Sequence, residues 1–119
     1  MALDHAEIIA RVLAQRERWV DIEPGKAVCM RRPPEVEMAR LRGGFSVESV
    51  AGYAVGWRGI TLGDLLGPDA EGAAAEIDFG AELWRTVVAD RIDWATTCAQ
   101  ALMELIGEQA SAREAARKN

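Results

Sequence analysis

The sequence predicts an α+β fold that is mainly helical, with five to six helices and one β-hairpin near the N-terminus. Apolar residues recur at three- and four-residue intervals over most of the 119 residues, whereas apolar and charged residues alternate only at about 18–32. Hydrophobic residues make up 50% of the chain and charged residues 28%, a composition typical of chains that fold around one core. We therefore expect a single compact domain over 1–110 and a polar tail, 111–119, that frays or extends as an exposed helix.

The first helix is expected over about residues 5–17. Asp4 and Glu7 have the spacing of a capping box, whose side chains accept hydrogen bonds from the free N–H groups of the first turn. One apolar stripe then recurs at helical intervals, formed by Ile8, Ile9, Val12 and Leu13. The segment is therefore predicted to be an amphipathic helix.

The hairpin is expected next, because apolar and charged residues alternate on both sides of the turn dipeptide Pro24-Gly25. Pro33-Pro34 ends its second strand, since proline has no N–H to donate to a neighbouring strand. Pro34 also suits the first turn of a helix. A short helix is therefore expected at 34–42, where Gly43-Gly44 stops it.

The middle of the chain is predicted to contain another helix and a turn. Ser46 is a favourable N-cap, and Phe45 with Val50 has the spacing of a hydrophobic staple, so the helix is expected at about 47–55. The segment that follows, Gly56 to Gly59, is interpreted as a turn because of its two glycines.

A capped helical turn and an exposed loop are expected after this point. Thr61 and Asp64 have the spacing of a cap for a single turn that carries three leucines. The acidic segment 69–78 has no apolar stripe and is interpreted as a loop on the surface.

Two longer helices are predicted to complete the fold. Phe79 and Trp84 repeat the staple spacing and place a helix at about 81–89. Asp90 and Asp93 then resemble a capping box at the start of the longest helix, which should reach about residue 109. Its apolar residues repeat at three- and four-residue intervals and include Trp94, Cys98, Leu102, Leu105 and Ile106.

The charges of the chain are unevenly distributed. The net charge is −5, yet residues 1–60 carry nine basic against eight acidic residues, and residues 61–119 carry five against eleven. A phosphate backbone needs a concentrated positive surface, so the sequence disfavours nucleic acid as a partner. The basic residues at the end of the hairpin and after it are instead interpreted as a solvated face or as a surface that docks a protein partner, with these candidates: Arg31, Arg32, Arg40 and Arg42.

The sequence carries no recognisable arrangement of catalytic or metal-binding residues. The single histidine, His5, lies in the first turn of a helix, and Cys29 and Cys98 are far apart without metal-ligand spacing. The acidic residues at helix starts are explained by the positive end of the helix dipole. We therefore predict a protein that is not an enzyme, has no metal site or cofactor, and works by binding other proteins.

Four tryptophans are many for a chain of this length, and such large rings serve as core filling or as interface anchors. Trp84 and Trp94 lie on helical stripes and are expected in the core. Trp57 stands in a connection between Gly56 and Gly59, so we expect it to fill the core beneath a loop.

The order of these features resembles a known family. The motifs are a hairpin that ends in Arg31-Arg32-Pro33-Pro34-Glu35, a Gly56-Trp57-Arg58-Gly59-Ile60 turn, an acidic loop, and the helix start Phe79-Gly80-Ala81-Glu82-Leu83-Trp84. In this order they are similar to those of the small tail assembly chaperones, or minor tail components, of long-tailed bacteriophages and prophages. The resemblance covers residues 18–106.

The resemblance implies an assembly factor in the cytoplasm of the bacterial host that binds the tape-measure protein and recruits tail-tube subunits. A long helical tape measure needs its apolar surface covered before the tube encloses it. This function requires no catalytic residue and no cofactor, and it leaves open whether the chain forms a homo-oligomer.

Two alternatives belong to other functional classes. One is a structural component of the phage tail or the head–tail connector that is retained in the particle and forms ring-like oligomers. The other is a small cytoplasmic regulator whose arginines bind an acidic partner or nucleic acid. No apolar run approaches the roughly 20 residues that span a bilayer, so no membrane association is expected.

Overall fold

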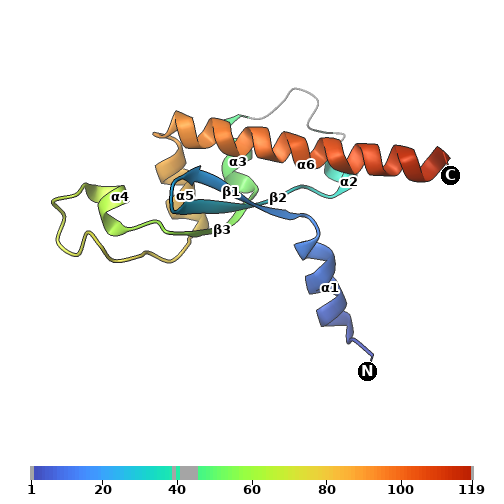
Figure 1. The fold of residues 1–119 in the computed structure, drawn as a ribbon, viewed down its shortest axis with the longest axis horizontal. Coiled ribbons are helices and arrows are strands. Elements are labelled where there is room, and N and C mark those ends of the chain that lie inside the picture. Colours follow the sequence, from blue (N-terminus) through green and yellow to red (C-terminus); the bar gives the residue numbers. More distant parts are fainter. Residues whose placement is uncertain (1, 39, 41–45, 119) are drawn as a thin grey trace.

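The computed structural model describes residues 2–38, 40 and 46–118, and it confirms an α+β fold that is mainly helical. The helices of this described part are α1 (His5–Ala14), α2 (Glu35–Met38), α3 (Val47–Gly52), α4 (Leu62–Leu66), α5 (Ala81–Val88) and α6 (Ile92–Lys118). The strands are β1 (Glu17–Glu23), β2 (Lys26–Arg31) and β3 (Ala54–Arg58). They form one antiparallel sheet in the order β1-β2-β3 (Figure 1).

Strands β1 and β2 form the predicted hairpin. Val20 lies opposite Val28, and both side chains are buried because they point to the face of the sheet that the helices cover. The chain reverses at Pro24-Gly25, where Gly25 adopts a φ of 79° that favours glycine. Exposure alternates along β1, where buried Val20 lies between exposed Trp19 and Asp21, whereas Ala27 to Met30 of β2 are all buried.

Strand β3 corrects the prediction of a helix to residue 55 followed by a turn. Helix α3 ends at Gly52, and the next residues pair with β2, so that Trp57 lies opposite Val28 and Gly56 opposite Cys29. A Cβ at Gly56 would meet Cys29 and the ring of Trp19 at 3.8 and 3.9 Å. Gly56 is thus a strand residue beneath a large side chain, and glycine was misread as a turn signal.

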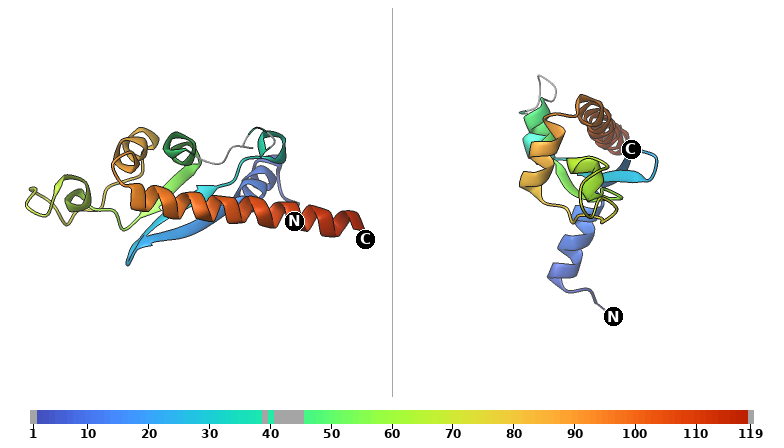
Figure 2. Two further views of the ribbon diagram at one scale, coloured as in Figure 1. Left: turned by 90° about the horizontal axis from the view of Figure 1, so that it is seen from above. Right: turned by 90° about the vertical axis from the view of Figure 1, so that its left-hand side faces the viewer.

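The core lies between one face of the sheet and a layer of three helices. Helix α6 contacts β1 and β2, α5 contacts β3, and α3 packs against both α5 and α6 (Figures 1 and 2). Met30, Ile60 and Leu102 have almost no exposed surface within this layer. The sheet and these helices therefore bury one another's apolar faces, as two-layer domains require.

The predicted structural tryptophans meet at the centre of this core. The rings of Trp84 and Trp94 stack with centroids 6.4 Å apart, and Trp84 meets Trp57 edge-on at 6.3 Å. Trp57 also contacts Phe79 edge-on at 5.5 Å and donates its Nε1–H to the carbonyl oxygen of Ile77 at 2.6 Å. Trp57 is therefore buried beneath the segment that joins α4 to α5.

Two predicted helix caps have the expected hydrogen bonds. The Asp4 carboxylate accepts from the Glu7 N–H at 2.8 Å, and Thr61 and Asp64 form a reciprocal capping box at α4. Asp93 at the start of α6 instead pairs with the Arg91 guanidinium, with oxygen–nitrogen distances of 3.0 and 3.2 Å. The caps predicted at Asp4 and at Thr61–Asp64 are therefore confirmed, whereas the Asp93 carboxylate binds the neighbouring Arg91.

The two ends of the chain extend from the core. Helix α6 continues through Lys118, so the predicted tail at 111–118 is an exposed helix rather than a frayed segment, and Asn119 lies outside the described residues. Helix α1 ends at Ala14, before β1 begins, and has no buried residue. The molecule measures 58 × 42 × 23 Å along its principal axes, and the packed core occupies its middle (Figure 1).

Two more predicted features lie partly outside the described residues. Helix α2 covers Glu35–Met38 within the predicted range 34–42, and Arg40 lies in a turn. Phe45, the outer residue of the staple before α3, is outside the described residues, whereas Ser46 accepts a hydrogen bond from the Ser49 N–H as an N-cap.

Replacement of Gly59 by alanine is expected to destabilise the fold by more than about 2 kcal/mol. Gly59 has a φ of 77°, and a Cβ there would lie far inside van der Waals contact with the Gly25 carbonyl oxygen. Urea unfolding measures the effect. Gly107→Ala is the matched control, because a Cβ at Gly107 meets nothing within 4 Å and alanine favours the helix interior by up to about 1 kcal/mol. Equal stability of the two variants would contradict the close contact between Gly59 and the Gly25 carbonyl group.

Candidate partner-binding surfaces

Helix α1 presents an apolar stripe that the described part of the chain leaves uncovered. Ile9 is 59% exposed, and Ile8, Val12 and Leu3 are also exposed. Figure 1 shows the helix projecting away from the sheet on the side opposite α6, and the end-on view in Figure 2 agrees. The stripe predicted from the sequence is therefore a surface feature and not part of the core.

The stripe matters because an isolated helix of this length is marginally stable in water. Helices shorter than about 12 residues gain most of their stability from packing an apolar face against another element. Helix α1 has 10 residues and a good N-terminal cap, yet no element covers its stripe. Burying one exposed isoleucine or valine on a partner would contribute about 1–2 kcal/mol. An apolar partner surface thus complements α1.

The structure places three of the four candidate arginines, and each has different surroundings. Arg31 donates to the Glu17 carboxylate at 2.8 Å, on the sheet face that the helices leave open. Arg32 donates to the Pro33 carbonyl oxygen at 3.0 Å, and Arg40 is exposed in the turn after α2. Arg42 lies outside the described residues.

Arg32 instead belongs to a second basic group. Burial lowers the pKa of its guanidinium, and the positive charges of Arg16 and Arg113 lower it further, while Glu35 opposes them. Arg113 is contributed by the far end of α6, more than 80 residues later in the sequence. Sequence reasoning missed this group because only the folded chain brings its members together.

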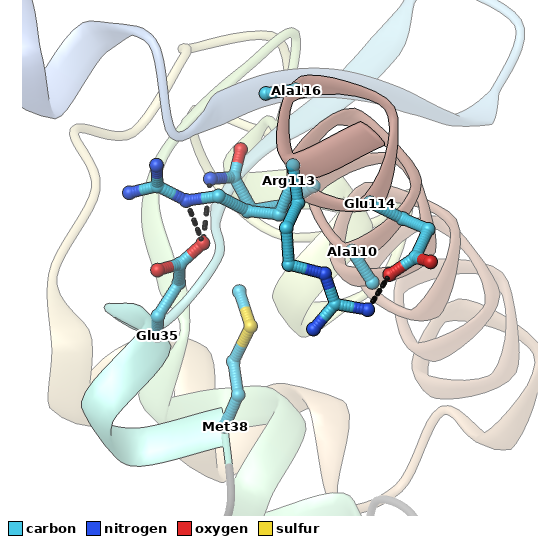
Figure 3. A pocket seen from close by; sticks show the side chains of 8 residues that line it. Glu35, Met38, Ala110, Arg113, Glu114 and Ala116 are labelled. Carbon is cyan, nitrogen blue, oxygen red and sulfur yellow. Dashed lines mark hydrogen bonds and ion pairs between the residues drawn. The ribbon is translucent and has the colours of Figure 1, made fainter. Parts of the chain in front are cut away.

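A groove of about 710 Å³ lies between α2 and the last turns of α6 (Figure 3). The carboxylate of Glu35 spans it, accepting hydrogen bonds from Arg113 Nε at 2.8 Å and Gln109 Nε2 at 2.9 Å. Its lining combines the apolar side chains of Met38 and Ala110 with charged groups. The groove is therefore an open, amphipathic surface whose two walls are joined by one ionised carboxylate.

Acidification is expected to release α2 from α6. The hydrogen bonds from Arg113 and Gln109 lower the pKa of Glu35 below its ordinary 4.5. A carboxylate with a lowered pKa stabilises the contact above its ordinary pKa, and the contribution is lost as the pH falls through the lowered value. The Met38 methyl resonance should therefore shift below pH 4.5, and Glu35→Gln should show that shift already at pH 7. A methyl shift in the variant that still follows the wild-type pH profile would contradict the role of Glu35.

The open face of the sheet carries a third exposed group. Trp19 is 46% exposed, and the Arg58 guanidinium carbon lies 4.6 Å from its ring centroid, a cation–π arrangement. Cys29 lies buried on the neighbouring strand, and burial, followed by the charge of Glu17, raises the pKa of its thiol. Burial raises the pKa of Cys98 in the core to about 12. Both thiols are thus poor nucleophiles.

The described residues contain no group of three or more His, Cys, Asp or Glu side chains placed to hold a metal ion. None of the helices described in the structure is long and apolar enough to cross a membrane. Comparisons with models of known protein families, with curated proteins and with solved structures find no match.

Proposed function

We propose that this chain is a bacteriophage tail assembly chaperone, which binds the tape-measure protein and recruits tail-tube subunits around it in the bacterial cytoplasm. The motifs over residues 18–106 support this proposal through their resemblance to that family. The observation that carries it is the uncovered apolar stripe of α1, which stands outside the core.

The stripe has the chemistry that a helical client requires. Two helices pack when apolar side chains at three- and four-residue intervals interlock, and Ile8, Ile9 and Val12 provide such a row. When α1 packs on the client, it protects the client's apolar face from water and from aggregation until the tube encloses the client. The chaperone and its client thus each bury a surface that neither can bury alone.

Separation of α1 from the core suits a protein with two partners. The core is stabilised by the sheet and three helices without any contribution from a buried α1 residue. The helix can therefore engage the tape measure while the open face of the sheet remains available to a tube subunit. Binding of this kind needs no chemical step, and it does not depend on a metal or a cofactor.

Co-expression with the tape-measure protein tests the proposal. We expect the tape measure to aggregate when expressed alone and to remain soluble as a complex that an affinity tag on this chain retrieves. The matched control is co-expression with an unrelated small acidic protein that carries the same tag. An insoluble tape measure, or a soluble one that this chain does not retrieve, would contradict the proposal.

Mass spectrometry of purified particles separates the chaperone from a structural component of the tail. A chaperone acts during assembly, so its peptides should be present in lysates of infected or induced cells and depleted in finished particles. Retention in particles at a fixed ratio to the tube protein would favour the structural component instead.

A further inference from the structure

The two ends of the long axis carry opposite charge. No lysine or arginine occurs between Arg58 and Arg85, whereas this stretch contains Asp64, Asp69, Glu71, Glu76, Asp78 and Glu82. Most of these residues belong to α4 and the loop that follows it, which lie at one end of the molecule, opposite the C-terminal end of α6 (Figure 1). We call residues 62–78 the acidic lobe.

The acidic lobe also presents an apolar side chain. Leu66, the last residue of α4, is 70% exposed, and the neighbouring Asp69, Glu71 and Glu76 are exposed as well. Only Asp64 has a basic partner on this lobe among the described ion pairs, the Lys26 ammonium at 3.4 Å. The lobe is therefore a protruding leucine surrounded by carboxylates that lack neighbouring cations.

The groove at the other end has the complementary chemistry. Met38, Ala110 and Ala116 contribute apolar surface, and methionine adapts its shape to what it contacts. Arg113 and Arg117 contribute two guanidinium groups whose side chains are 69% and 78% exposed. Arg32 and Arg16 add positive charge next to Arg113. Each of these arginines already pairs with one carboxylate of the groove, Arg113 with Glu35 at 2.8 Å and Arg117 with Glu114 at 2.6 Å (Figure 3). A guanidinium has five N–H donors, so both side chains keep donors for a further carboxylate.

We propose that the acidic lobe of one copy docks in the groove between α2 and α6 of a second copy. Leu66 then contacts Met38 and Ala110, and the carboxylates of the lobe pair with Arg113 and Arg117. The lobe and the groove lie at opposite ends of a molecule 58 Å long, so a single copy cannot close this contact on itself. The contact is head-to-tail, and such contacts produce rings or open chains of copies.

The contact should be weak and sensitive to salt. Exposed ion pairs each contribute only about 0–1 kcal/mol to an association. Exposed charge pairs are largely screened beyond about 3 Å at 1 M salt. The proposal concerns a surface other than α1 and is independent of the tape-measure protein, so it is tested on the isolated chain.

Sedimentation velocity and light scattering on the full chain over a concentration series test the proposal. We expect the average mass to rise above 12.9 kDa with concentration at low salt and to return to that value at high salt. Two charge-reversal variants should each remain monomeric: Asp69→Lys with Glu71→Lys in the lobe, and Arg113→Glu with Arg117→Glu in the groove. An equimolar mixture of the two variants should associate again, because each supplies the surface that the other lacks.

Two further variants make the result specific. Leu66→Ala changes no charge and should weaken association at least tenfold, since it removes the apolar contact. Arg85→Glu reverses an exposed charge on α5 that belongs neither to the acidic lobe, residues 62–78, nor to the lining of the groove, and it should leave association unchanged. Circular dichroism verifies that each variant is folded. A chain that stays monomeric at low salt, or association that is lost with Ile9→Glu in α1 and kept in the groove variant, would overturn the proposal.

Discussion

Replacement of Trp84 by alanine is expected to lower the free energy of unfolding by about 3–5 kcal/mol. Trp84 has no exposed surface, and its ring lies between those of Trp57 and Trp94. Alanine would leave a cavity at the point where the sheet, α5 and α6 meet. Since small domains are stable by only about 5–15 kcal/mol, this variant should be close to unfolded at 37 °C.

Urea unfolding followed by circular dichroism measures this effect. Trp19→Ala is the matched control, because Trp19 is half-exposed on the open face of the sheet and its removal leaves no cavity in the helix layer. We expect the control to lose at most about 1–2 kcal/mol. Similar losses for the two variants would contradict the assignment of Trp84 to the centre of the core.

Replacement of Ile9 by glutamate is expected to weaken binding to the tape-measure protein about 10- to 100-fold while leaving stability within about 0.5 kcal/mol. The most exposed residue of the stripe is Ile9, and α1 has no buried residue, so folding does not depend on it. In a helix-on-helix contact, however, the new carboxylate would be buried against an apolar surface without a partner.

Isothermal titration calorimetry with a soluble fragment of the tape measure measures this change. Ala14→Glu adds the same charge to the same helix, on the side away from the stripe by helical geometry, and should bind nearly as well as the wild type. Loss of binding in both variants would indicate a general effect of charge on α1. Unchanged binding in Ile9→Glu would exclude the stripe from the contact.

The sequence was most informative where structure depends on neighbours along the chain. The Asp4–Glu7 cap, the Thr61–Asp64 box and the hairpin around Pro24-Gly25 are all decided within a few residues. The buried positions of Trp84 and Trp94 followed from helical periodicity, because a large ring on an apolar stripe packs best in the core.

The sequence did not predict the features that depend on residues far apart in the chain. Strand β3 was missed because Gly56 is set by its packing against Trp19, which is 37 positions earlier in the chain and which no local pattern reveals. The groove forms where Arg113 of α6 donates a hydrogen bond to Glu35 of α2, and its positive charge comes from residues of α6 that are far from α2 in the sequence. The stripe of α1 was found, but the sequence alone does not tell an exposed stripe from a buried one, because both have the same periodicity.

The exposed position of Trp19 can be derived from the sequence. In β1, Trp19 alternates with Val20 and Ile22, so a hairpin with one buried face places Trp19 on the opposite face. The alternation of buried and exposed residues along β1 therefore predicts that Trp19 is exposed. The Arg58 guanidinium over its ring could not be predicted, since it required strand β3.

Hydrogen exchange of the chain, free and in complex with the tape-measure protein, tests the central claim most directly. The amides of His5–Ala14 should exchange rapidly in the free chain, because α1 is a short helix without a covered face. In the complex they should become strongly protected, while the amides of β2 and the core of α6 change little. Protection that arises elsewhere and leaves α1 exchanging as in the free chain would contradict the account.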